Sequence, residues 1–215
     1  MFSIDDVHSF VAIAHSHGAC NRALSVIKTI DNIEDVLNHP NAPYWACWYA
    51  MHVIKGRWTR AEATISTSAE YAYWYAKNMI KARWTEAEAT ICTSAEYAYL
   101  YAMHVIKGRW AEAEATISTS PKWAYYYARY EINGRWAEAE PVIMTSPEYA
   151  YLYARDVVDR RWAEAEPVIV TSAEYAYRYA KDVINGRWAE AEVVISTDPK
   201  WASYYARDVL MIPYN

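Results

Sequence analysis

Residues 95–120 read AEYAYLYAMHVIKGRWAEAEATISTS, and the chain repeats this stretch with few changes. Its Arg-Trp pair returns every 26 residues, at Trp58, Trp84, Trp110, Trp136, Trp162 and Trp188. A fixed period of this length is typical of stacked repeat proteins, in which each unit buries its apolar face against its neighbours. We therefore predict six full repeats over residues 41–196, a C-terminal half repeat over 197–215 and a degenerate N-terminal cap over 1–40.

Each repeat carries two helical patterns, from about Glu96 to Lys107 and from about Trp110 to Ser118 in the quoted stretch. The sequence thus predicts an all-α fold, an α-solenoid of short helical hairpins behind an atypical helical cap. A lone hairpin buries too little to offset its conformational entropy, because one buried aromatic ring contributes only about 2 kcal/mol. Stacking between repeats must supply the rest of the stability.

Proline, glycine and short polar residues mark the helix ends. Prolines suit the first helical position behind a Ser or Asp N-cap, as at Pro121, Pro147 and Pro199 after Ser120, Ser146 and Asp198. Glycine fits the end of the first helix at Gly56, Gly108, Gly134 and Gly186. Ala82 and Arg160 replace it in two repeats, so a left-handed glycine is not obligatory there. Pro141 and Pro167 predict a second helix that begins late or lacks one backbone hydrogen bond.

A helical wheel at about 100° per residue divides the first helix into two arcs. One arc holds residues that recur in every repeat, and we predict that it is the packing face. Its structural candidates are Tyr97 and Tyr101, joined by Trp110 and Glu114 of the second helix. The Glu114 column is unbroken, and a half-buried carboxylate there needs donors that Tyr hydroxyls or the Arg109 column could supply.

The opposite arc changes from repeat to repeat, and we call it the variable face: the three columns that begin at Trp48, Met51 and His52. It passes from aromatic and His residues near the N-terminus to alternating Arg and Asp near the C-terminus. Trp, Tyr, Met and Arg are enriched at protein interfaces, so this face is the candidate binding surface, against the alternative of a merely solvated face. Its candidate residues are Trp48, His52, Trp74, His104, Tyr126, Arg129, Tyr130, Arg155, Asp156, Arg178, Lys181, Asp182, Arg207 and Asp208.

Composition narrows the class of protein. The 54% apolar content, with 21 Tyr and 11 Trp, argues against a disordered chain. The net charge of −5 leaves no cationic excess for a polyanion, which disfavours nucleic acid as a partner. Three widely spaced cysteines, an acidic start without a signal-peptide pattern and the lack of a long apolar run favour the cytoplasm and argue against a membrane.

No catalytic motif or convincing metal set is visible. The chain has no glycine-rich phosphate loop and no nucleophile motif, so we predict no enzymatic activity, no catalytic residues and no cofactor. His15, His17 and Cys20 lie close together, but a structural zinc site needs a second ligand pair that does not follow. We interpret this cluster as an ordinary polar part of the cap.

The segment GRWAEAEPVI at residues 134–143 is similar to the first-helix signature of tetratricopeptide repeats. The pattern GRW-x-EAE-x-x-I…EYAY-x-YA-x-x-VI, over residues 41–210, more closely resembles the tandem repeat proteins that tailed bacteriophages encode. This resemblance implies a helical repeat fold, a phage origin and hence the cytoplasm of a bacterial host. It implies no established activity and no functional residue.

These observations favour a non-enzymatic binding protein that engages a protein partner. The phage resemblance suggests inhibition of a host enzyme or defence component as the corresponding role. Self-assembly into an oligomer or filament is the alternative, because Met211 and Pro213 stand where the next Gly-Arg-Trp would come. A binder of nucleotides or single-stranded nucleic acid is a lesser alternative, since rings and Arg at regular spacing can stack bases.

Overall fold

The computed structural model describes residues 7–211, so residues 1–6 of the predicted cap and residues 212–215 of the predicted half repeat, Pro213 among them, lie outside the described part. Within that part the chain is all-α and contains no strand. This confirms the predicted α-solenoid of short helical hairpins. The chain divides into two compact units, one up to Lys107 and one from Gly108, and each is described by itself.

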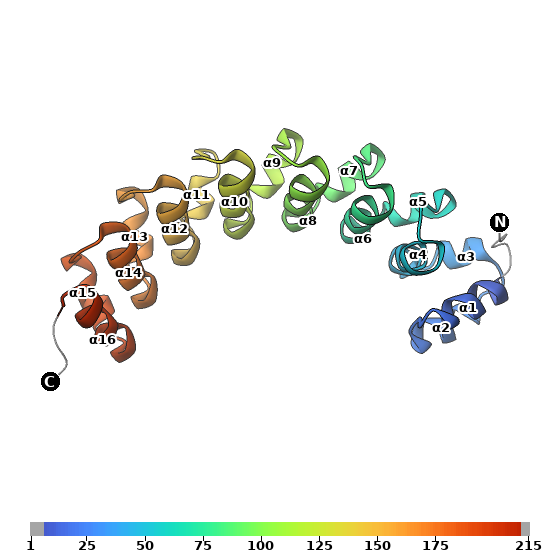
Figure 1. Ribbon diagram of the computed structural model, residues 1–215, viewed down its shortest axis with the longest axis horizontal. Helices are drawn as coiled ribbons and strands as arrows, with labels where there is room; N and C mark the ends of the chain where they lie inside the picture. The colour runs from blue at the N-terminus through green and yellow to red at the C-terminus, as the bar shows by residue number, and fades with distance from the viewer. Residues whose placement is uncertain (1–6, 212–215) are drawn as a thin grey trace. The chain divides into compact units, whose positions relative to one another are not determined.

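Unit 1 contains the cap and the first repeats. The first helices of successive repeats, α4, α6 and α8, lie side by side, and the second helices α5 and α7 pack behind them (Figure 1). Arg60 of α5 reaches back to Glu34 of α3 at 2.6 Å, which ties the cap to the first repeat. The helices of unit 1 are α1 (Val7–Ser16), α2 (Asn21–Ile27), α3 (Ile33–Leu37), α4 (Ala42–Tyr49), α5 (Thr59–Ile65), α6 (Ala69–Tyr75), α7 (Thr85–Ile91) and α8 (Ala95–Tyr101).

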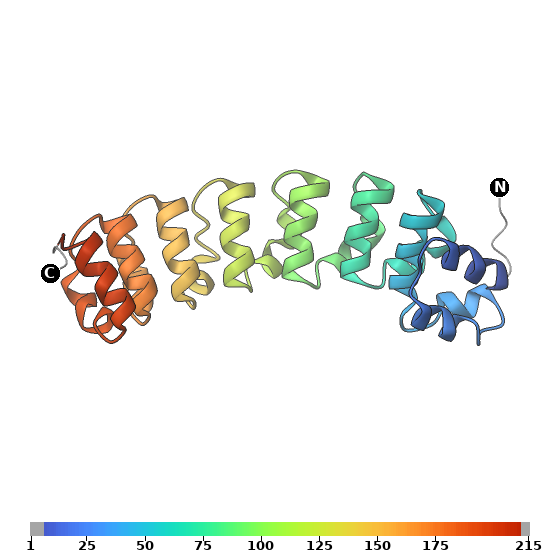
Figure 2. The same ribbon diagram turned by 60° about the horizontal axis from the view of Figure 1, so that its bottom comes forward.

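Unit 2 repeats the same arrangement. Its first helices α10, α12, α14 and α16 stand side by side, as the yellow to red part of Figure 2 shows. The helices of unit 2 are α9 (Ala111–Ile117), α10 (Pro121–Tyr127), α11 (Glu140–Ile143), α12 (Pro147–Tyr153), α13 (Glu166–Ile169), α14 (Ala173–Tyr179), α15 (Glu192–Ile195) and α16 (Pro199–Asp208).

The first helix of each full repeat ends in a wide π turn, which the sequence did not predict. After α8, for example, the N–H of Lys107 donates to the carbonyl of Ala102, five residues back, at 2.7 Å. A π turn holds more residues than the 3.6 of an α-helix, so the wheel loses its register beyond Ala102. The six turns are η1 (Ala50–Ile54), η2 (Ala76–Ile80), η3 (Ala102–Ile106), η4 (Ala128–Ile132), η5 (Ala154–Val158) and η7 (Ala180–Ile184).

The left-handed residue that ends each first helix is not the glycine but the residue before it. Six non-glycine residues there have φ between 54° and 62°, namely Lys55, Lys81, Lys107, Asn133, Asp159 and Asn185. A side chain added at Gly108, Gly134 or Gly186 would meet nothing within 4 Å. A left-handed glycine is thus not needed, as the sequence indicated, and Ala82 and Arg160 fit the glycine position without strain.

The predicted helix starts are confirmed. Pro121, Pro147 and Pro199 each begin a first helix, and Asp198 accepts bonds from the N–H groups of Lys200 and Trp201. In the repeats with Pro141 and Pro167 the second α-helix begins late, at Glu140 and Glu166. The last repeat does the same without a proline: the 3₁₀ turn η8 (Ala189–Ala191), like η6 (Ala163–Ala165) before α13, precedes its α-helix. Proline is therefore compatible with the late start but not required for it.

The core alternates alanine with large rings. Ala98, Tyr101 and Ala102 of the first helix are fully buried, and Trp110 is 2% exposed. Alanine lets neighbouring helices approach, and the rings fill the remaining space. The packing face is narrower than the wheel predicted, because Tyr97 is only half-buried.

Candidate binding surface

A four-residue polar cluster recurs in every full repeat and fixes the hairpins. In one repeat Arg135 donates through Nε and Nη2 to the carboxylate of Glu140, both at 2.8 Å. The Tyr153 hydroxyl donates to Glu140 at 3.0 Å and accepts from the backbone N–H of Trp136 at 2.7 Å. The hydrogen bond from Arg135 lowers the pKa of Glu140, although burial opposes it. Both kinds of donor named from the sequence are thus used, here and at Glu62, Glu88, Glu114, Glu166 and Glu192.

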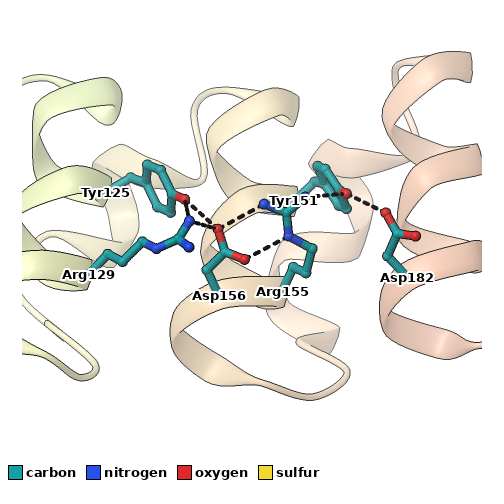
Figure 3. A network of polar contacts seen from close by, with 6 residues as sticks. All are labelled: Tyr125, Arg129, Tyr151, Arg155, Asp156 and Asp182. Atoms are coloured by element: carbon teal, nitrogen blue, oxygen red, sulfur yellow. Dashed lines mark hydrogen bonds and ion pairs between the residues drawn. The ribbon is translucent and has the colours of Figure 1, made fainter.

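A second polar network links successive first helices of unit 2 on the variable face (Figure 3). The Tyr125 hydroxyl of α10 donates to Asp156 of the next repeat at 2.5 Å and accepts from Arg129 at 2.6 Å. Asp156 also pairs with Arg129 and, through Nε at 2.7 Å and Nη2 at 2.9 Å, with Arg155. We call this arrangement, in which a tyrosine is bonded to a cation and to an acid of the next repeat, the polar ladder.

The polar ladder continues toward α16. Tyr151 donates to Asp182 at 2.5 Å, and Arg155 donates to Tyr151 at 2.9 Å. One repeat later Tyr177 donates to Asp208 at 2.5 Å, and Asp208 pairs with Lys181 at 3.1 Å and Arg207 at 2.5 Å. Asp182 differs from its counterparts, because within residues 7–211 it has no ion pair and only the Tyr151 hydroxyl as donor.

Charge and burial together set the pKa values along the polar ladder. Burial raises the pKa of Tyr125 and of Tyr151 to about 12 each, and the acid that each one bonds adds to the rise. Burial opposes ionisation of Asp156, but the hydrogen bonds from Arg155 and Tyr125 outweigh it and lower the pKa of Asp156. Asp156 is therefore ionised and Tyr125 and Tyr151 are protonated at neutral pH, which suits structural bonding rather than proton transfer.

Unit 1 contains a weaker version of the same contact. The Tyr73 hydroxyl lies 2.9 Å from Nδ1 of His104 and accepts from Lys77 at 3.1 Å. His104, predicted as a free binding residue, thus links two repeats. In the repeat before, the position of the ladder tyrosine is held by Cys47, which is buried and cannot make this bond.

The N-terminal groove lies where Cys47 replaces the ladder tyrosine. It measures about 200 Å³, and it runs between α4 and α6. Trp74 is 37% exposed and Tyr44 is 43% exposed, so two rings of the groove face solvent. Trp48 and His52 of the variable face lie 4.9 Å apart between ring centroids at its side. The groove is lined by Tyr44, Cys47, Trp48, Met51, His52, Glu70, Tyr71 and Trp74.

The C-terminal groove lies on the variable face between α14 and α16 of unit 2. It measures about 460 Å³ and is mainly charged. Lys200 lies 4.1 Å from the centroid of the Trp201 ring, and Arg207 lies 4.8 Å from that of Tyr204. Arg178 pairs with Glu174 at 2.9 Å. The groove is lined by Tyr177, Arg178, Lys181, Asp182, Lys200, Trp201, Tyr204, Arg207 and Asp208.

The structure thus sorts the predicted binding residues into groups. Trp48, His52 and Trp74 line the N-terminal groove, whereas Tyr126 and Tyr130 stack on each other with ring centroids 6.3 Å apart. The remaining candidates lie in the polar ladder, the C-terminal groove or both: Arg129, Arg155, Asp156, Arg178, Lys181, Asp182, Arg207 and Asp208.

Sequence reasoning missed the ladder tyrosines and Glu70. The sequence contained an indirect signal for the ladder, because Arg129 precedes Asp156 by 27 residues and Lys181 precedes Asp208 by the same interval. Such a fixed offset places a cation and an acid on adjacent repeats. Glu70 gave no comparable signal, since its place in a groove beside Trp48 and Trp74 is visible only in the structure.

No protein-family model, no curated protein and no solved structure matches this chain. Among residues 7–211, no three His, Cys, Asp or Glu side chains are grouped to hold a metal ion. No helix in the described part of the chain is long and apolar enough to cross a membrane.

Proposed function

We propose that this chain is a non-enzymatic binding protein that engages a protein partner through the N-terminal groove of its variable face. The observation that carries the proposal is the row of accessible rings there, with Trp48, Trp74 and Tyr44 around one concave surface. Trp and Tyr dominate the binding energy of protein interfaces when they sit at a pocket.

The N-terminal groove differs from the equivalent C-terminal groove in the side chains that line it. Tyr73 and Tyr125 occupy the position equivalent to Cys47, and there each ring packs against the next first helix. A groove at this position does not depend on Cys47, because the C-terminal groove has Tyr177 there. The N-terminal groove is distinguished by Trp48 and Trp74 in its lining, which favours a binding role over a merely solvated face.

The resemblance to phage repeat proteins extends the proposal to the origin of the partner. A phage-encoded binding protein would meet bacterial host proteins, and a host enzyme or defence component is the corresponding target. This extension rests on the repeat pattern alone.

Affinity selection from a displayed peptide library on the whole chain tests the proposal. Selected peptides are then titrated by calorimetry against the wild type, Cys47→Tyr, Trp74→Ala and the control Tyr130→Ala, whose ring is 52% exposed in unit 2. Cys47→Tyr adds a ring to the lining of the groove, and it is the side chain that the next repeats carry there, so the fold accepts it.

We expect Cys47→Tyr and Trp74→Ala each to weaken binding at least tenfold, about 1.4 kcal/mol, and Tyr130→Ala to leave it unchanged. Circular dichroism of each variant checks that the helices are intact. Peptides that bind all four proteins alike, or a selection that yields no saturable binder, would refute the proposal. Light scattering that showed a stable oligomer closed by this groove would point instead to self-assembly.

A further inference from the structure

The N-terminal and C-terminal grooves occupy equivalent positions in the repeat. Their residues are separated by 130 positions, five periods of 26, so Trp48 corresponds to Arg178 and Glu70 to Lys200. The same backbone scaffold therefore presents two different sets of side chains. Comparing them shows what each groove is suited to bind.

The C-terminal groove already holds an arginine between an acid and a ring. Nε of Arg178 donates to Glu174 at 3.0 Å, and its guanidinium lies 5.7 Å from the centroid of the Trp201 ring. A guanidinium is flat and weakly hydrated, so it stacks on an aromatic face while its N–H groups bond a carboxylate. Arg178 thus shows, within the chain, how a guanidinium is held between a carboxylate and a ring beside such a groove.

The N-terminal groove has rings and an acid but no Lys or Arg in its lining, and its acid lies at another position, because Tyr44 corresponds to Glu174. Trp48 stands where the C-terminal groove has Arg178, and Glu70 forms no ion pair within residues 7–211. The one bond shown for the Glu70 carboxylate is with the Tyr97 hydroxyl. Four rings surround the opening, and the faces of aromatic rings carry negative potential.

Glu70 is the only acidic residue in the lining of the groove, which contains no Lys or Arg. Burial is the main cause that raises the pKa of the Cys47 thiol to about 12, and the charge of Glu70 adds to it. Glu70 acts in the same direction on Tyr71, where burial is again the larger cause of the raised pKa. Lys77 lies beside the groove, with its Nζ 5.3 Å from the Trp74 ring centroid, and it donates to Tyr73.

We propose that the N-terminal groove binds an arginine side chain of the protein partner, with its guanidinium stacked on Trp48 or Trp74 and bonded to the Glu70 carboxylate. This inference rests on the proposed function and names the residue by which the partner is anchored. Arginine suits the site better than lysine, because a planar fork can stack and bond a carboxylate at once, whereas an ammonium acts as a point charge.

The test uses the whole chain with ¹⁵N-labelled tryptophan and three short probe peptides. The peptides are acetyl-Gly-Arg-Gly-amide, the same peptide with neutral citrulline, and the same peptide with glutamate. The indole N–H signals of Trp48 and Trp74 are assigned from Trp48→Phe and Trp74→Phe. Citrulline keeps the shape of arginine but is neutral, with a urea oxygen in place of one NH₂ group, so it is the matched control.

We expect the arginine peptide to shift both indole signals with a saturable curve, and the citrulline peptide to bind at least tenfold more weakly. Glu70→Gln keeps an acceptor for Tyr97 and should lower the affinity for the arginine peptide at least tenfold. Lys200→Gln, the equivalent change in the other groove, should leave these signals and their affinity unaltered. Equal binding of arginine and citrulline, tighter binding of the glutamate peptide, or an unaltered affinity in Glu70→Gln would overturn the inference.

The two proposals fail in different ways. Library peptides that lose affinity for Cys47→Tyr but not for Glu70→Gln would leave the groove as the binding site and remove arginine as its anchor. Peptides that Cys47→Tyr binds as well as the wild type does would remove the groove itself.

Discussion

Tyr153→Phe tests whether the recurring polar cluster holds the hairpins together. The Tyr153 side chain is fully buried, and its hydroxyl joins two groups at once, the backbone N–H of Trp136 at 2.7 Å and the carboxylate of Glu140 at 3.0 Å. Phenylalanine keeps the ring and its contact with Trp162, whose centroid lies 5.1 Å away. The substitution therefore removes the two hydrogen bonds and little else.

The cost follows from what the missing hydroxyl leaves behind. A buried N–H without an acceptor costs about 1–3 kcal/mol, and here it is the backbone group of Trp136. Glu140 loses one charge-assisted bond but keeps both bonds from Arg135, and its side chain is 12% exposed, so this loss adds only about 1 kcal/mol. We expect a decrease of about 2–4 kcal/mol in the free energy of unfolding.

Urea unfolding followed by circular dichroism measures the change in free energy. Repeat proteins can unfold in parts, so amide hydrogen exchange at Trp136 provides a local measure that does not assume two states. Tyr130→Phe is the control, because that ring is 52% exposed. A loss below about 0.5 kcal/mol, equal to that of the control, with unchanged protection of the Trp136 amide, would refute this account of the cluster.

Three further outcomes follow from the geometry. Lys81→Gly should raise the free energy of unfolding by about 0.5–1 kcal/mol, because Lys81 has a left-handed φ of 59°. Gly134→Ala should change this free energy little, because the added side chain would meet nothing within 4 Å. The reverse order of the two variants in urea unfolding would contradict the left-handed assignment. Asp156→Asn should lower the free energy of unfolding by about 1–2 kcal/mol, which is more than Asp182→Asn, because of these two acids only Asp156 pairs with two arginines. Equal losses for the two variants in urea unfolding would argue against the polar ladder. The Arg135 hydrogen bond holds the pKa of Glu140 below its ordinary 4.5. Glu140 therefore contributes its full stabilisation above pH 4.5, and this stabilisation is lost as the pH falls through the lower pKa of the folded state. Urea midpoints that rise on acidification would contradict this account.

The period and composition were sufficient to predict the fold class. A constant 26-residue interval with recurring Tyr, Ala and Trp specifies hairpins that bury the same faces in every repeat, and the structure has them. The starts of the first helices were also predictable, because Pro121 and Asp198 act through local backbone chemistry that does not depend on neighbours.

The helix ends were not predicted, since a wheel with 3.6 residues per turn cannot represent a π turn. The residues before the glycines gave a signal, because Asn133, Asp159 and Asn185 belong to the types that tolerate left-handed backbone best. Lys81 and Lys107 stand at the same position in other repeats, and lysine does not indicate a left-handed backbone, so the pattern was not recognised. The π turn itself depends on how the end of the first helix packs, which no single repeat records.

The candidate site shows a different kind of limit. Contrast between recurring and drifting positions was expected to separate packing from binding, and in unit 2 it does not, because Arg129 and Asp156 drift and yet bond adjacent repeats. These positions differ from those of unit 1 because they contain a cation and an acid that pair across adjacent repeats, as Arg129 does with Asp156. Residues committed to such pairs have little free charge to offer another molecule.

Binding capacity depends on which side chains line the space between successive first helices. The N-terminal groove has Cys47 in the ladder column and the C-terminal groove has Tyr177 there, so a concavity forms with either residue. The two grooves differ instead in the exposed columns, which supply Trp48 and Trp74 to one and Arg178 and Tyr204 to the other. Charged residues of the C-terminal groove pair within the chain, whereas Trp74 of the N-terminal groove is 37% exposed, so the exposed columns decide what each groove can bind.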